Sequence, residues 1–234
     1  MGNSPMVSYT QISPNKTTLR NRTIDTITIH CVVGQCSIET LGSIFARESR
    51  RASSNYGIGP DGRIGMYVEE KDASWCSSNS ANDRRAITIE CASDKTHPYA
   101  INDKVYSSLV DLCADICIRN NIKELKWKAD KTLIGQTDKQ NITVHRWFAN
   151  KSCPGDYIYE RLGQITKDVN EKIRQPFKVR VTIDDLNYRS YPSINGIIRG
   201  QTGKGVFTIV EVSNGWGRLK SGAGWINLSY TTRL

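Results

Sequence analysis

Two six-residue runs, TITIHC at 26–31 and AITIEC at 86–91, share an Ile-Thr-Ile core and differ in the polar residue that follows it. Side chains alternate between the two faces of a strand, so the isoleucines of each run point one way, whereas His30 and Glu90 point the other way. If the isoleucines face covering helices, an imidazole and a carboxylate share one cleft. Polar strand ends on a solvated sheet face would give the same pattern.

A third segment, VHRWFANKSCPGDY at 144–157, adds two residue types that bind metals. His145 and Cys153 are eight positions apart, outside the tight ligand spacing of structural zinc fingers. With His30 they would supply two imidazoles and one thiolate. Such a set leaves the fourth tetrahedral position open to water, as catalytic zinc sites do. The alternative is an ordinary surface histidine and a buried cysteine.

The segments that must position these residues predict an α/β domain. IDTITIH and AITIEC have the composition of strands, and YGIGPDGRIGMYV predicts a hairpin that turns at Pro60-Asp61-Gly62. Helical periodicity is found in IETLGSIFARE, which starts near Ser37, and in INDKVYSSLVDLCADICIRNN, which starts near Asn102. We expect the strands to share one mixed sheet flanked by helices.

The pattern changes near residue 175. A helical stretch at 155–174 meets Pro176, and the chain beyond it holds short β-type runs separated by Asn-Gly or Gly-rich turns. This spacing is typical of a small all-β barrel. The sequence therefore predicts two domains, 1–175 and 176–234.

Composition limits the class of protein. Of 234 residues, 38% are hydrophobic and 24% charged, as in folded globular domains. We expect no membrane-spanning helix, because no apolar run is long enough. The N-terminus lacks the apolar region of a secretory signal, which predicts synthesis in the cytosol. The odd count of seven cysteines argues against a disulfide framework, and Cys113 and Cys117 fit the apolar face of a helix.

The formal charge is +9, and residues 176–234 hold eight basic and three acidic residues. A basic surface suits a polyanionic partner, either nucleic acid or an anionic wall polymer such as a teichoic acid. The chain contains no base-reading motif, so we expect no nucleic-acid partner.

The strand-borne histidine, the YGIGPDGRI hairpin, the ITIE strand and the H-x7-C-P-G segment together resemble the zinc-dependent N-acetylmuramoyl-L-alanine amidases of type 2. This family includes amidase-type phage lysozymes and the peptidoglycan recognition proteins. The resemblance covers roughly residues 20–170. It implies the amidase fold and hydrolysis of the amide between N-acetylmuramate and the L-alanine of the peptidoglycan stem peptide.

Carried over by position, the resemblance implies a Zn²⁺ cofactor with three ligands: His30, His145 and Cys153. Glu90 stands at the catalytic carboxylate of the family, and Lys151 stands at its lysine two positions before the third ligand. Tyr56 matches a tyrosine that some members use near the bound water. These residues imply zinc-assisted attack of water, with Glu90 as the base and Lys151 stabilising the oxyanion.

Each of these side chains also has a structural alternative. Lys151 could be a solvated surface lysine, and Tyr56 could simply pack in the hairpin. Trp75 is expected to line the substrate groove, although an aromatic residue in a loop can also be a packing anchor. His97, in a polar stretch before a proline, is expected to be exposed and not a ligand.

The C-terminal part is similar to bacterial SH3-like wall-binding domains, through LNYRSYPS, an Asn-Gly-Trp and a Gly-Trp-Ile motif. Tyr188 departs from the valine that this pattern more often has. We expect Tyr188, Arg189 and Tyr191 to face the wall ligand, and Trp216 and Trp225 to lie in the domain core.

These observations favour a modular peptidoglycan hydrolase of the phage endolysin kind. Without an export signal, such an enzyme would reach the wall only after release, by a holin if it is phage-encoded. A recognition module without catalysis is the alternative, but its relatives usually lose the cysteine ligand, and Cys153 is present. A regulatory partner of another protein and a DNA-binding tail are two further hypotheses.

Overall fold

The computed structural model describes residues 2–234, which form two compact units. The first comprises the chain up to Ile116 together with Glu124–Asn170, and the second comprises Cys117–Lys123 with Glu171–Leu234. A six-stranded sheet of order β1-β5-β4-β7-β3-β8 forms the centre of the first unit. Its strands are β1 (Val7–Thr10), β3 (Thr26–Cys31), β4 (Tyr56–Ile58), β5 (Ile64–Met66), β7 (Ala86–Cys91) and β8 (Ile142–Val144). Only β4 and β5 pair antiparallel, so the predicted mixed sheet is confirmed.

The two similar runs of the sequence are neighbouring strands. β3 and β7 pair in parallel along their whole length, with His30 beside Glu90. In-register neighbours of a sheet point to the same face, so the imidazole and the carboxylate lie on one face, as the alternation predicts. The isoleucines at 27, 29, 87 and 89 are fully buried on the other face.

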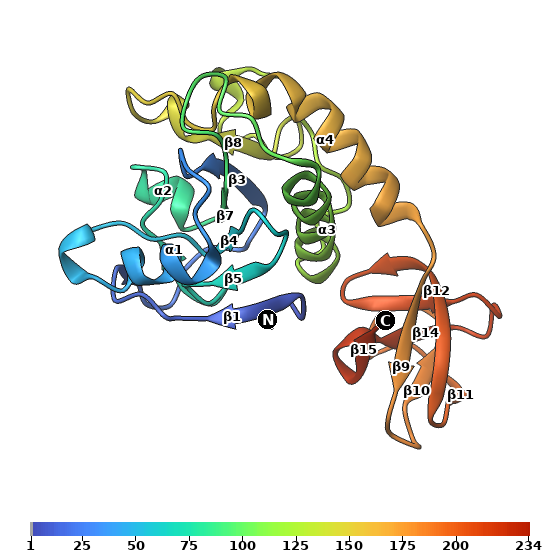
Figure 1. Ribbon diagram of the computed structural model, residues 1–234. Helices are drawn as coiled ribbons and strands as arrows, with labels where there is room; N and C mark the ends of the chain where they lie inside the picture. The colour runs from blue at the N-terminus through green and yellow to red at the C-terminus, as the bar shows by residue number, and fades with distance from the viewer. Residues whose placement is uncertain (1) are drawn as a thin grey trace. The chain divides into compact units, whose positions relative to one another are not determined.

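Helices cover both faces of this sheet (Figure 1). α1 (Ile38–Phe45) and α2 (Ser80–Asp83) lie on one side, and α3 (Asp103–Arg119) and α4 (Asp156–Arg174) lie on the other. α1 packs closely, because a Cβ added at Gly57 would lie 2.6 Å from Leu41 Cδ2. The predicted caps are confirmed: Ser37 accepts from the Thr40 amide and Asn102 from the Val105 amide. α1 ends at Phe45, three residues earlier than expected, since no apolar position follows to bury.

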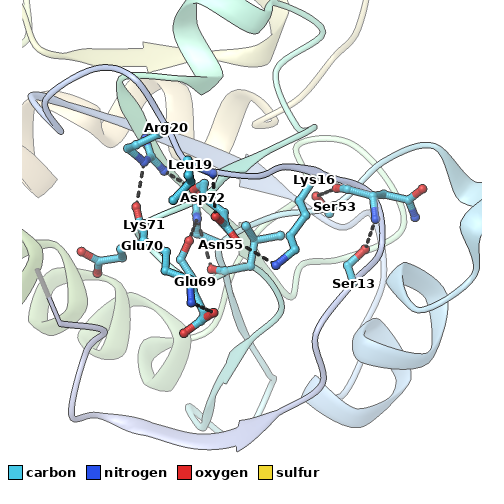
Figure 2. A network of polar contacts seen from close by, with 12 residues as sticks. Ser13, Lys16, Leu19, Arg20, Ser53, Asn55, Glu69, Glu70, Lys71 and Asp72 are labelled. Carbon is cyan, nitrogen blue, oxygen red and sulfur yellow. Dashed lines mark hydrogen bonds and ion pairs between the residues drawn. The ribbon is translucent and has the colours of Figure 1, made fainter.

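A polar network fixes the N-terminal arm of the chain against the segment before β7 (Figure 2). Lys16 forms an ion pair of 2.6 Å with buried Asp72, on the loop that leads into β6 (Ala73–Ser74), and β6 pairs with β2 (Lys16–Thr17). Arg20 donates to the carbonyl oxygens of residues 70, 72, 83, 84 and 86 at 2.7–3.3 Å. One guanidinium therefore ties together the two ends of the loop that carries α2.

The second unit contains an all-antiparallel sheet of seven strands, as expected for an SH3-like domain. Its strands are β9 (Phe177–Val181), β10 (Asn187–Arg189), β11 (Ile198–Gln201), β12 (Gly205–Ser213), β13 (Trp216–Leu219), β14 (Trp225–Asn227) and β15 (Thr231–Arg233). Its core is a cluster of buried aliphatic side chains: Val179, Val181, Leu186, Ile209, Leu219 and Ile226. The domain boundary after residue 175 stays a prediction.

All seven cysteines are free thiols, which agrees with the absence of a disulfide framework. Cys113 and Cys117 are fully buried on α3, as their spacing predicts. Within residues 2–234, none of the helices combines the length and the apolar character that a membrane span requires.

Candidate metal centre and active site

The three predicted metal ligands come together at the ends of neighbouring strands. His30 is the next-to-last residue of β3, His145 directly follows β8, and Cys153 lies in the loop before α4. One donor atom of each lies within 4.8 Å of the other two. Two imidazoles and a thiol at this spacing are a donor set that suits zinc and leaves a coordination position for water.

Hydrogen bonds set the orientation of these side chains. His145 Nε2 lies 3.0 Å from Ser78 Oγ, and His30 Nδ1 lies 3.4 Å from Cys153 Sγ. The Cys31 amide also donates to Cys153 Sγ, at 3.4 Å. An outer partner fixes the ring orientation of a ligand histidine, so Ser78 at Nε2 leaves Nδ1 of His145 to face a metal. Cys153 is itself a predicted ligand, and its contact with His30 Nδ1 turns that nitrogen toward the cluster.

Glu90 lies beside this cluster, one strand away. Its carboxylate belongs to a second group with His30 and Cys76, in which the ligand atoms also lie within 4.8 Å of one another. The Cys76 thiol donates to Glu90 Oε1 at 3.9 Å, and Glu90 Oε2 is buried without a hydrogen-bond partner among residues 2–234. A carboxylate with one uncommitted oxygen at a metal cluster is suited to accept a proton from water.

Burial drives the ionisable groups of the site toward their neutral forms. Desolvation, aided by His145, lowers the pKa of His30 to about 3. Desolvation and the positive charge of Lys151 lower the pKa of His145. Burial raises the pKa of Glu90 to about 7, although Arg50 opposes the shift. Histidines must be neutral to bind a metal, so both imidazoles are in the correct state at neutral pH.

Two cations lie near the cluster. Lys151 is exposed, and its influence on the His145 pKa places its charge near the predicted ligands. Arg50, at the end of a short 3-10 helix (Glu48–Arg50), acts electrostatically on Glu90. Positive charge at this position would favour an anionic oxygen that develops during acyl transfer.

Tyr56 does not join the cluster. It pairs with Ile89, and therefore lies on the isoleucine face of the sheet, opposite to Glu90. Its side chain is fully buried, its hydroxyl donates to Glu70 Oε1 at 2.6 Å, and the Ser4 amide donates to it at 2.9 Å. These contacts fit the alternative reading of a packed hairpin residue, and a role near a bound water stays an untested prediction.

Trp75 and His97 lie at the surface. Trp75 is 37% exposed, donates from Nε1 to Thr17 Oγ1 at 2.9 Å and directly precedes Cys76, so it is available to a bound ligand. His97 is exposed, as expected, and contacts Asp156 Oδ2 at 2.8 Å; it belongs to neither group of candidate metal ligands.

Three residues of the site escaped the sequence reasoning: Arg50, Cys76 and Ser78. Cys76 follows β6, whose Ser74 hydroxyl bonds Thr88 on β7 at 2.7 Å, and this contact holds the loop beside Glu90. Ser78 adopts a positive φ of 62° as its hydroxyl meets His145. The signal for Cys76 and Ser78 was the polar run SWCSSNSAN at 74–82, shortly before the β7 strand, and no such signal marked Arg50.

The predicted wall-facing residues of the second unit differ in exposure. Tyr188 packs against the core cluster, and Arg189 Nη1 donates to the Gly196 carbonyl at 2.8 Å. Tyr191 is 48% exposed. Of the two tryptophans expected in the core, Trp216 is buried and Trp225 is half-buried.

Comparison with known proteins agrees with this geometry. A family model described as N-acetylmuramoyl-L-alanine amidase matches residues 20–156, which is more than half of the chain. A comparison with curated protein sequences finds no significant match. Solved structures are similar to about 70% of the chain. They include the Staphylococcus aureus hydrolase AmiA in complex with its ligand (18% identity, TM-score 0.51, 73% of this chain and 84% of that chain).

Two further similar structures are PlyL (16% identity, TM-score 0.47, 69% of this chain and 95% of that chain) and the amidase LysC from Clostridium intestinale URNW (17%, 0.46, 70% and 95%). At these identities the AmiA likeness shows the fold alone. The family assignment rests on the sequence match, which includes His30, Glu90, His145 and Cys153.

Proposed function

Because the chain belongs to the N-acetylmuramoyl-L-alanine amidase family, we propose that it hydrolyses the amide bond between N-acetylmuramate and the L-alanine of the peptidoglycan stem peptide. The observation that carries this proposal is the convergence of His30, His145 and Cys153 within 4.8 Å, beside Glu90, whose Oε2 is buried without a hydrogen-bond partner in residues 2–234. Two neutral imidazoles and a thiol would hold Zn²⁺.

When bound, zinc would polarise the scissile carbonyl and lower the pKa of a water molecule. The other tasks fall to side chains of this chain. Glu90 takes a proton from the attacking water through its uncommitted oxygen and returns it to the leaving nitrogen. Burial raises its pKa to about 7 in the metal-free protein, which makes it a stronger base than an exposed carboxylate.

Lys151 is proposed to stabilise the negative charge that develops on the carbonyl oxygen. Its ammonium group is solvent-exposed and acts on His145, so it can approach a substrate at the cluster without a buried, unpaired charge in the free protein. Trp75, at the surface next to Cys76, is proposed to contact the substrate.

We further propose the domain assignment 1–175 for catalysis and 176–234 for attachment to the cell wall. The seven-stranded antiparallel sheet of the second unit supports an SH3-like module. Its basic excess would favour anionic wall polymers. Action at the wall, after release from the cytosol, accords with this arrangement, and holin dependence stays a prediction.

The test uses the purified full chain and a defined muropeptide, with and without a chelator, and identifies the products by mass spectrometry. The expected product is an intact stem peptide with a free L-alanine amine, lost on chelation and restored by zinc. Glu90→Gln, with zinc content measured in parallel, is the matched control. Cleavage at a glycosidic bond, or hydrolysis that continues at the same rate in chelator, would contradict the proposal.

A further inference from the structure

A second cluster of metal-binding groups shares His30 with the first. His30, Cys76 and Glu90 each offer one ligand atom, and these atoms lie within 4.8 Å of one another. Cys76 comes from the loop after β6 and donates to Glu90 Oε1 at 3.9 Å. The predicted catalytic set does not use Cys76, and the position of this thiol beside the carboxylate needs a separate explanation.

Two side chains of this second cluster each have a buried polar atom that lacks a partner. His30 Nε2 and Glu90 Oε2 have no hydrogen-bond partner in the part of the chain that the structure describes. Buried polar atoms are normally satisfied, and an exception points to a ligand, an ion or a strained functional group. His30 Nδ1 is at 3.4 Å from Cys153, so the first cluster leaves the other nitrogen of the same ring unused.

We propose that His30, Cys76 and Glu90 form a second position for a zinc-like ion, and that filling this position inhibits the amidase. The inhibition follows because an ion bound to the Glu90 carboxylate removes the base that the reaction needs. Only this second part rests on the proposed function. Binding of the ion depends on the cluster alone.

The chemistry of the three donors sets which ions bind. Thiolate and imidazole with one carboxylate favour zinc, cadmium and cobalt, whereas magnesium and calcium prefer oxygen ligands. Binding releases the protons of the Cys76 thiol and the Glu90 carboxyl, and that of the His30 ring where both nitrogens coordinate. Because these protons are displaced and one histidine is shared, the second position fills after the first.

The binding test uses the full chain, stripped by a chelator and titrated with Zn²⁺ or Cd²⁺, with bound metal counted by equilibrium dialysis and mass spectrometry. We expect two ions per chain for the wild type and one for Cys76→Ser. The thiolate-to-cadmium absorption should rise with the second equivalent in the wild type but not in Cys76→Ser. Cys36→Ser, which alters a half-buried cysteine outside both clusters, should still bind two ions.

Saturation of the wild type at one ion, or two ions on Cys76→Ser, would overturn the second position. The inhibition is tested by muropeptide hydrolysis, with each variant normalised to its own rate at one equivalent of zinc. The wild-type rate should fall as the second ion binds, the Cys76→Ser rate should not, and Mg²⁺ should have no effect. Full hydrolysis with two ions bound would refute the inhibition. Absence of hydrolysis at every ratio of zinc to protein would refute the amidase proposal, and the number of bound ions would then decide alone whether the second position exists.

Discussion

Glu90→Gln should leave the metal-free protein with a changed pH dependence of stability. Burial raises the pKa of Glu90 from 4.5 to about 7. Between these two values the unfolded chain has lost the proton while the folded chain keeps it. The free energy of unfolding of the wild type therefore falls as the pH rises through this window, and the Glu90 contribution becomes constant above it. Glutamine stays neutral and abolishes this contribution.

The magnitude follows from the shift. At 1.36 kcal/mol per pKa unit, the raised pKa of Glu90 lowers the free energy of unfolding, relative to its value at low pH, by about 3 kcal/mol at pH 8.5 and about 1 kcal/mol at pH 5. The difference in stability between Glu90→Gln and wild type should thus grow by about 2 to 3 kcal/mol in favour of the mutant between these pH values. Any fixed cost of burying the glutamine amide cancels in this comparison.

The assay is urea unfolding of both proteins in chelator at the two pH values, with linear extrapolation to water. Glu39→Gln is the control, because the hydrogen bond from Arg63 lowers the pKa of Glu39 and the difference cannot grow in the same direction. If the difference in free energy of unfolding between Glu90→Gln and wild type is the same at both pH values, the raised pKa of Glu90 is refuted. With zinc restored, the variant should bind metal and lose about 10²- to 10⁴-fold in kcat.

Four other changes test separate parts of the structure. Cys153→Ser should weaken zinc binding by more than the roughly 10- to 100-fold typical of outer-shell changes, and metal analysis that finds full zinc content would contradict the ligand assignment. Deletion of 176–234 should spare hydrolysis of soluble muropeptides but weaken binding to intact walls by about 10²-fold or more; equal sedimentation with walls would exclude the attachment role. Arg20→Met should destabilise the protein by about 3 kcal/mol, because five backbone carbonyls lose a buried donor, and a loss under about 1 kcal/mol in urea unfolding would show that water replaces it. Tyr191→Ala should reduce wall binding without lowering the unfolding temperature, since the side chain is 48% exposed; unchanged wall binding would remove Tyr191 from the ligand surface.

The strand pair at the centre of the site could be predicted because its determinants are local. Alternation along TITIHC and AITIEC fixes which side chains share a face, and the observed register sets His30 directly beside Glu90. The caps at Ser37 and Asn102 were equally local, since each needs only one side chain and an amide close by in the chain.

The residues that sequence reasoning missed depend on long-range contacts. Cys76 reaches Glu90 only because β6 is held against β7 and β2, and Ser78 meets His145 across 67 positions of the chain. Tyr56 shows the reverse case. The family resemblance suggested a place near a bound water, whereas its pairing with Ile89 turns its side chain to the face opposite Glu90. The periodicity of the sequence does not reveal which residue pairs with Tyr56, and so does not reveal which face of the sheet its side chain takes.

The metal-free site carries little charge. Desolvation keeps His30 and His145 neutral and favours the protonated form of Glu90, so the fold buries these groups without an unpaired ion. A divalent ion reverses this balance, because its charge favours the thiolate of Cys153 and the carboxylate of Glu90. Burial raises the pKa of Glu90 and a bound ion would lower it, so burial keeps this carboxylate a stronger base than an exposed one beside the same ion. The stability that ionised Glu90 costs the metal-free protein is therefore a consequence of the same burial that the proposed chemistry uses.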